Sequence, residues 1–293
     1  MSSPLSPTAR PHPARPVTVY GPPSLARLAP GAMLRRLGGS WDLFATLSAH
    51  RMRVRYTQSR LGILWAVLQP LVLMAVFTLM VRFLGTGRTG GVPYPVFAYA
   101  ALVPWTAFAS GLSSAATSLT AHAALLTKVS FPRELLPLTY VTVALADLLV
   151  AATVLAGLMV WFGVPLTPLA LWALLAVALL ALFLLGAGLA LSALQVRLRD
   201  VGLALPVLLQ LWLFATPVLY PLDAVRHALP PAAYGVYLLN PMVGVVDTFR
   251  RTLLLQQAPD LPALFTGLAV SLVLLPLAYA WFKWVELTMA DVL

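Results

Sequence analysis

Apolar residues fill six long stretches of the chain, and polar residues are concentrated in the segments between them. The stretches cover residues 61–81, 94–119, 135–162, 168–194, 201–222 and 261–284. A helix needs about 20 apolar residues to cross the hydrocarbon core of a membrane. The pattern therefore predicts an all-α polytopic membrane protein, whose region 61–293 forms six transmembrane helices.

The segment 40–60, ahead of the first stretch, has a mixed pattern. Read as a helix, it carries an apolar face opposite a polar face, the first with Trp41, Leu43, Phe44 and Leu47 and the second with Asp42, His50 and Arg51. Such a division is typical of helices that lie in the plane of a membrane surface. We expect an N-terminal amphipathic interface helix along the inner leaflet.

The segment 221–262, between the fifth and sixth stretches, is too apolar for a solvated loop. Two short helices broken at Asn240 and Pro241 would hide its apolar surface, either in the outer leaflet or over the end of the bundle. We predict a re-entrant or interfacial outer hairpin.

Composition and charge support the membrane assignment. The chain is 60% hydrophobic and 10% charged, and its mean hydropathy is +0.89. Its net charge of +10 does not indicate nucleic-acid binding, because the basic residues lie between long apolar spans. Most of them fall in segments that share one side if the N-terminus is cytosolic, so both termini are predicted to be cytosolic. Residues 1–39 are rich in Pro, Ser and Arg and predict a disordered cytosolic leader.

Three arginines stand directly before the first span. Arg53, Arg55 and Arg60 are expected at its cytosolic interface, where guanidinium groups meet anionic headgroups. Pro70, inside this span, predicts a kink that would suit a helix beside a pathway.

Motifs for catalysis are missing. A phosphate-binding loop needs Lys after Gly, and the two lysines, Lys128 and Lys283, follow Thr and Phe. The four histidines are isolated from one another, and the chain has no cysteine, which excludes disulfides. We expect no enzyme activity, no metal and no cofactor in this chain.

Asp147 is the one acid inside a predicted span. It could serve a proton relay, as in a secondary transporter, or be a protonated or hydrogen-bonded carboxyl that only packs. No second intramembrane acid, Lys or Arg is evident to complete a relay. Both readings remain open.

The cytosolic segment "LLTKVSFPREL" (125–135) has a proline that stops the preceding helix and charged residues that suit a polar partner. A short helix in this position could dock into a groove on another subunit. A plain loop has the same composition, so the pattern alone does not decide between them.

Several motifs, in order along residues 41–291, resemble one known family. They are "RYTQSRLGILWAVLQPL" (55–71), "KVSFPRELLPL" (128–138), "VRLRDVG" (196–202), "TPVLYPL" (216–222), "LNPMVGVVDTFR" (239–250) and "FKWVELTMADVL" (282–293). The family is that of the type-2 ABC-transporter permeases for polysaccharide export, which includes O-antigen, capsule and teichoic-acid exporters. "RMRVRY" (51–56) and Met289 depart from the usual family pattern.

The resemblance implies the transmembrane subunit of an ATP-driven exporter in the bacterial inner membrane. Its partners would be a second copy of itself, two P-loop nucleotide-binding subunits that hold ATP and Mg, the lipid-linked polysaccharide and membrane lipids. Alternatives are a type-2 exporter of a drug or lipid, a membrane enzyme acting on polyprenyl phosphate, and a secondary transporter.

The resemblance also implies four sets of functional residues. The ATPase-coupling set is Lys128, Phe131, Pro132, Arg133 and Glu134. The set at the entry of the substrate or lipid phosphate is Arg53, Arg55, Arg60, Arg197, Arg199 and Asp200. The outer gate would contain Asn240, Pro241, Phe249 and Arg250. Candidates for channel aromatics, of which a minority is expected to face the channel, are Trp65, Phe77, Tyr99, Trp105, Phe108, Trp212, Phe214 and Tyr220.

Overall fold

The structure of the protein is a computed structural model that describes residues 38–57, 60–84, 91–128, 131–287 and 289. The predicted leader lies almost wholly outside these residues. The described part is helical and contains no strand. The elements are α3 (Trp41–Thr57), α4 (Leu64–Leu84), α5 (Tyr94–Ala116), α6 (Ser118–Ala121), α7 (Ala123–Lys128), α8 (Leu135–Trp161), the 3-10 turn η1 (Pro168–Leu171), α9 (Trp172–Arg197), α10 (Val201–Phe214), α11 (Leu222–Ala228), α12 (Pro231–Leu238), α13 (Pro241–Leu253) and α14 (Leu261–Glu286).

Five helical segments of the described chain are long and apolar enough to cross a membrane. They are Leu64–Phe83, Tyr94–Ala116, Leu135–Trp161, Pro168–Arg197 and Leu261–Glu286. The fifth predicted span, 201–222, is the shorter apolar helix α10. At 14 residues it is about 21 Å long, because the chain leaves the helix after Phe214 and continues in turns.

Local sequence signals set the helix ends. The side chain of Asn240 accepts a hydrogen bond from Met242 N at 3.1 Å and starts α13, and Asp260 accepts one from Ala263 N at 3.1 Å and starts α14. Gly163, at φ 68°, ends α8 in a left-handed turn that glycine adopts without strain.

Helix α5 is the centre of the bundle and is buried along most of its length. It packs against α4, α8, α9 and α13. Close approach to α8 and α9 requires a small residue, since a Cβ on Gly111 would lie 2.7 Å from Ala144 Cβ and 2.8 Å from Leu184 Cδ2. The partners of α5 therefore surround it on several sides. Its partner α4 and the short helix α10 lie at the periphery and expose apolar side chains.

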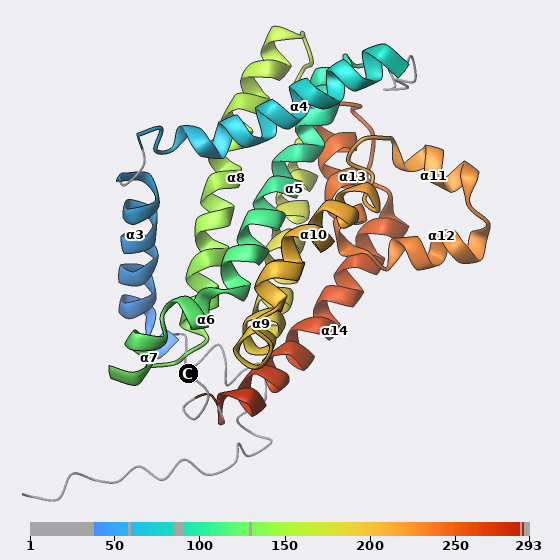
Figure 1. Ribbon diagram of the computed structural model, residues 1–293. Helices are drawn as coiled ribbons and strands as arrows, with labels where there is room; N and C mark the ends of the chain where they lie inside the picture. The colour runs from blue at the N-terminus through green and yellow to red at the C-terminus, as the bar shows by residue number, and fades with distance from the viewer. Residues whose placement is uncertain (1–37, 58–59, 85–90, 129–130, 288, 290–293) are drawn as a thin grey trace, which may run out of the picture.

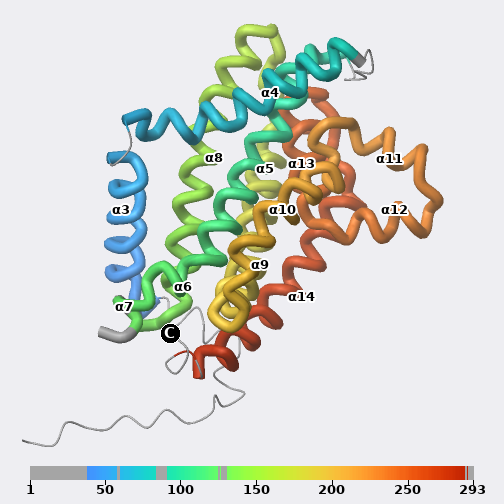
Figure 2. The backbone as a smooth tube through the Cα atoms, viewed as in Figure 1, coloured from blue at the N-terminus to red at the C-terminus, as the bar shows by residue number. Residues whose placement is uncertain are grey.

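The two ends of the bundle carry different parts of the chain. Helices α6 and α7, the start of α8, the end of α9 and the end of α14 lie at one end (Figure 1). The end of α4, the start of α5 and the hairpin helices α11, α12 and α13 lie toward the other, as the tube in Figure 2 shows. Residues 131–134 and 197–200 and the end of α14, which the charge pattern predicts to be cytosolic, thus lie together. The end of α3 does not join them: Arg55, predicted at the cytosolic interface, pairs with Asp147 near the middle of α8, and α4 starts toward the other end (Figure 1).

Helix α3 stands beside the first half of α8 (Figure 1). Phe44 and Leu47 of the predicted apolar face are partly buried, but Trp41 is 62% exposed. The assignment of Arg51 to an outward polar face is wrong, because its guanidinium lies 3.9 Å from the ring centroid of Tyr140 in α8. The cation–π contact draws this charged side chain to the packed side of α3.

Candidate coupling site, polar pocket and outer hairpin

The predicted coupling segment contains α7 and residues 131–134. It lies at the end of the bundle where α14 finishes (Figure 1). Lys128 is the last residue of α7, and its side chain lies outside the described residues. Pro132 is half-buried in the turn that leads into α8. A short helix followed by a proline turn is therefore present where the sequence predicts it.

Glu134 does not face a partner from this segment. It is 0% exposed, and its Oε2 lies 2.7 Å from Lys283 Nζ in α14. Lys283 Nζ also lies 2.7 Å from Glu286 Oε2. The expectation that Glu134 offers its charge to another subunit is wrong for this structure, because a buried carboxylate needs an internal cation, and Lys283 supplies it.

Two neighbours of Glu134 also bind α14. Arg133 Nη1 donates a hydrogen bond of 3.2 Å to the carbonyl oxygen of Glu286. Phe131 packs against a buried apolar cluster that includes Tyr279, Phe282 and Val285 of α14. Residues 131–134 are thus fastened to the last turns of α14.

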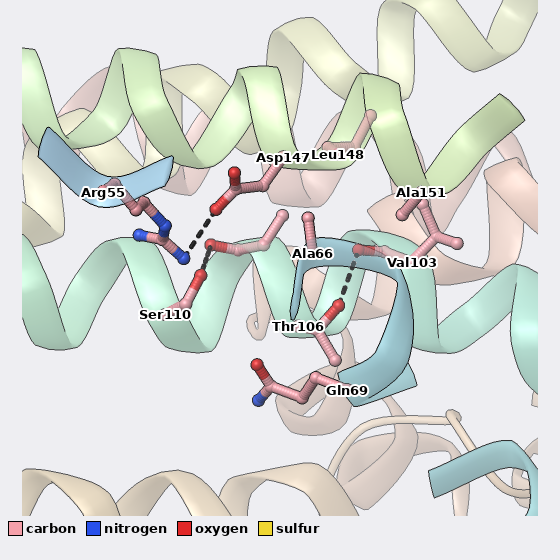
Figure 3. A pocket seen from close by; sticks show the side chains of 10 residues that line it. Arg55, Ala66, Gln69, Val103, Thr106, Ser110, Asp147, Leu148 and Ala151 are labelled. Atoms are coloured by element: carbon pink, nitrogen blue, oxygen red, sulfur yellow. Dashed lines mark hydrogen bonds and ion pairs between the residues drawn. The ribbon is translucent and has the colours of Figure 1, made fainter. Parts of the chain in front are cut away.

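A small polar pocket lies where α3 and α4 meet α5 and α8 (Figure 3). Arg55 Nη2 lies 2.7 Å from Asp147 Oδ2, and Tyr56 donates a hydrogen bond to Asp147 Oδ1. Gln69, Thr106 and Ser110 are among the residues that complete the lining. Asp147 is therefore a hydrogen-bonded carboxyl that is also ion-paired, and Arg55 is the cationic neighbour that was not evident from the sequence.

The six residues expected near the substrate entry do not form one cluster. Arg55 is paired with Asp147, whereas Arg53 and Arg60 are exposed and make no ion pair within the described part of the chain. Arg197 lies over the rings of Trp281, at 5.6 Å, and Trp284, at 4.3 Å. Arg199 and Asp200 are exposed between α9 and α10.

Four of the eight candidate channel aromatics belong to the core. The buried ones, with their exposed fractions, are Phe77 (8%), Tyr99 (0%), Trp105 (3%) and Phe108 (0%). Phe108 stacks on Phe183, with ring centroids 5.4 Å apart, and meets Trp212 edge-on at 5.2 Å. The four buried rings are unsuitable for a channel formed between two copies, because they are covered by helices of their own chain. Trp65, Phe214, Trp212 and Tyr220 retain exposed surface.

The outer hairpin has a buried arm and an exposed arm. Helices α11 and α12 project from the bundle in Figure 1, whereas α13 packs against α5, α9 and α14. The break predicted at Asn240 and Pro241 is confirmed, since α12 ends at Leu238 and α13 begins at Pro241. Phe249 is 4% exposed and forms part of the core.

Arg250 is buried in α13 and holds the chain that follows α10. Its Nη2 donates to the Val218 carbonyl at 2.7 Å, and its Nη1 donates to the Tyr220 carbonyl at 3.0 Å. The guanidinium also lies 3.7 Å from the ring centroid of Phe97. Burial lowers the pKa of Arg250 to about 10, so the side chain is still charged at neutral pH.

Charged groups of α11 and α13, with Asp260 just ahead of α14, form further ion pairs. Arg251 lies 3.2 Å from Asp223 Oδ2 and 3.4 Å from Asp247 Oδ2. Burial raises the pKa of Asp247 to about 6, although Arg251 and Arg250 lower it. Arg226 Nη1 lies 3.6 Å from Asp260 Oδ2. No group of His, Cys, Asp or Glu in the described residues is arranged to hold a metal ion.

Sequence reasoning missed the three pairings that organise these sites: Arg55 with Asp147, Glu134 with Lys283, and Arg250 with two backbone carbonyls. A signal for the first was present, because a carboxylate inside a span needs a cationic or hydrogen-bonding partner. Nothing in the local sequence around Glu134 points to Lys283, which lies 149 residues away.

Comparison with known proteins gives consistent results along the chain. The family model described as ABC-2 type transporter matches residues 42–254. The O-antigen export system permease protein RfbA of Myxococcus xanthus is 31% identical over 252 residues, which are 86% of this chain and 95% of that protein. The polysialic acid transport protein KpsM of Escherichia coli is 28% identical over 218 residues, which are 71% of this chain and 80% of that protein. The capsule polysaccharide export inner-membrane protein CtrC of Neisseria meningitidis serogroup A is 28% identical over 206 residues, which are 67% of this chain and 73% of that protein.

Proposed function

Because the chain belongs to the ABC-2 type transporter family, we propose that it is the transmembrane subunit of an ATP-driven exporter for a lipid-linked polysaccharide. The observation that carries the proposal is the similarity to the O-antigen permease of Myxococcus xanthus, which extends over 95% of that protein. The relatives named for polysialic acid and capsule export belong to the same substrate class. The polymer is an O-antigen, a capsule or a teichoic-acid-like polysaccharide.

The working unit in this proposal has two copies of the chain and two copies of a separate P-loop ATPase, which holds ATP and Mg. Two copies are proposed because one chain offers too few helices to enclose a passage as wide as a polymer, and a two-fold arrangement supplies the rest. Gathering of α7 and the ends of α9 and α14 at one end supports a single docking face for the ATPase (Figure 1). In this proposal both termini are cytosolic, as the distribution of basic residues predicts.

The proposal also assigns a route for the substrate. Arg53 and Arg60, which are exposed and make no ion pair within the described residues, are suited to recruit the phosphate groups of the carrier lipid. Trp65 and Phe214, which are the most exposed of the candidate aromatics, are suited to stack on sugars in a passage between two copies. The hairpin of α11, α12 and α13 covers the outer end.

The test is deletion of the gene in its own host, with immunodetection of polysaccharide at the cell surface and extraction of lipid-linked polysaccharide from the membrane fraction. We expect surface polymer to disappear and lipid-linked polymer to accumulate inside, with both effects reversed by the wild-type chain. A chain with Leu174→Ala, at an exposed position of α9, is the matched control and should also restore export.

Surface polymer that persists after deletion would refute polysaccharide export. Loss of drug resistance or of a surface lipid in the same strain would favour the alternative cargo. Crosslinking in the membrane, followed by mass spectrometry, tests the partner separately, and we expect a P-loop ATPase in an amount equal to that of the chain.

A further inference from the structure

The coupling segment is fastened to one helix that is distant in sequence. Glu134 forms a buried ion pair with Lys283 at 2.7 Å, and Arg133 donates to the carbonyl of Glu286. Phe131 adds an apolar contact to the same turns of α14. Inside the protein an ion pair has little competition from water, so these contacts hold the start of α8 and the end of α14 together as one body.

The other end of α14 is in backbone contact with α13. A Cβ on Gly244 would lie 2.6 Å from the carbonyl oxygen of Ala263 and 3.1 Å from Leu264 Cα. A Cβ on Gly267 would lie 3.1 Å from Pro241 Cα. Contact this close leaves no side-chain layer to absorb a displacement, so we expect α13 to follow any movement of α14.

Helix α13 in turn holds the segment after α10. Arg250 reaches the carbonyls of Val218 and Tyr220, and Asn240 Nδ2 donates to Thr216 Oγ1 at 3.0 Å. A continuous set of packed or hydrogen-bonded contacts therefore runs from residues 131–134, along α14, to α13 and residues 216–220. Figure 2 shows α14 extending from the α7 end toward the hairpin.

We propose that α14 is the rigid link that carries movement of the coupling segment to the outer hairpin, and that Lys283 is the positioning residue that attaches the link. The inference rests on the proposed function, because it requires an ATPase that moves the coupling segment. Helix α9 also packs on both α13 and α14, but only α14 receives the buried charge of the coupling segment. Removal of the Glu134–Lys283 pair should therefore separate movement at one end from movement at the other.

The absence of cysteine from the chain makes the test direct. A single cysteine at Ala233 of α12 or at Ala121 of α6, both exposed, can carry an environment-sensitive fluorophore. The first reports on the outer hairpin and the second on the cytosolic end. Each labelled chain is assembled with its ATPase in lipid nanodiscs, and fluorescence is recorded with and without ATP and vanadate.

The test variant combines Glu134→Gln with Lys283→Met, because removing both charges leaves no unpaired ion in the buried pair. Glu286, which also loses its contact with Lys283, is partly exposed to solvent. We expect the A121C reporter to keep its full nucleotide response and the A233C reporter to lose at least four-fifths of its response. Basal ATP hydrolysis should persist while polymer export falls at least tenfold. The charge exchange Glu134→Lys with Lys283→Glu should restore part of the A233C response.

A normal A233C response in the neutral variant would overturn the inference. Equal loss at both reporters would also overturn it, because it would show general damage to the subunit. If the neutral variant fails to insert in the membrane, the charge-exchange variant is tested in its place. An A233C response in that variant no larger than the response with Lys283→Met alone would then count against the inference. By contrast, the proposed function would be refuted if the chain without the charge substitutions bound no ATPase, or if its A121C reporter showed no response to nucleotide.

Discussion

Replacement of Arg250 by methionine tests how strongly α13 holds the segment after α10. The substitution removes two charge-assisted hydrogen bonds, of 2.7 and 3.0 Å, and the cation–π contact with Phe97. Bonds from charged donors contribute about 1.5–3 kcal/mol each, and their loss leaves two carbonyls without these donors. Burying methionine does not carry the cost of burying a charge, which offsets part of this loss. We therefore expect the free energy of unfolding to fall by about 3 kcal/mol.

The assay is equilibrium unfolding of the purified chain in mixed micelles, with SDS as denaturant and tryptophan fluorescence as signal. Arg226→Met is the matched control, because Arg226 has an exposed side chain and pairs with Asp260 at 3.6 Å. An exposed pair contributes about 0–1 kcal/mol. If the Arg250 variant loses no more stability than this control, the buried contacts do not hold the hairpin, and the reasoning is refuted.

Three further predictions concern the same contacts. Gly244→Ala should lower the thermal unfolding midpoint in detergent and reduce export, because its Cβ meets the backbone of α14, whereas Gly235→Ala, with open space around it, should not. Arg55→Met should lower the membrane level of the protein by leaving the Asp147 carboxylate without its cation, and adding Asp147→Asn should restore much of that level in an immunoblot. Asp247 has a pKa raised to about 6 by burial, so its folded state binds a proton more readily than the unfolded state, and stability should fall as pH rises from about 4 to 6. Asp247→Asn should flatten this part of the profile of unfolding midpoint against pH, and an unchanged slope would contradict the prediction.

The helices were predictable because each apolar run carries its own length and its own stop signals. Pro93, Asn240 and Asp260 mark the starts of α5, α13 and α14, and Gly163 marks the end of α8. The fifth span was predicted too long, because apolar residues continue beyond Phe214 while the backbone turns. Hydrophobicity reports on burial in lipid or protein, and it does not distinguish a helix from a buried turn.

The contacts at the candidate sites could not be read in the same way. Glu134 and Lys283, which are 149 residues apart, pair only because the fold places the turn before α8 beside the end of α14. The charge of Glu134, in a segment predicted to be cytosolic, looked available to a partner, but the fold buries it completely. Similarly, Phe108 and Tyr99 have the chemistry of sugar-stacking residues, and only the position of α5 at the centre assigns them to the core.

The central place of α5 has a consequence for synthesis of the protein. The ribosome makes α5 early, but α9, α13 and α14 emerge later, and two of these three helices cover its buried sides. Until residue 253 has been made, Tyr99 and Phe108 lack part of their final surroundings. We therefore expect α5 to depend on temporary cover from lipid or the insertion machinery. A chain stopped before α13 would expose a surface that membrane proteases can recognise.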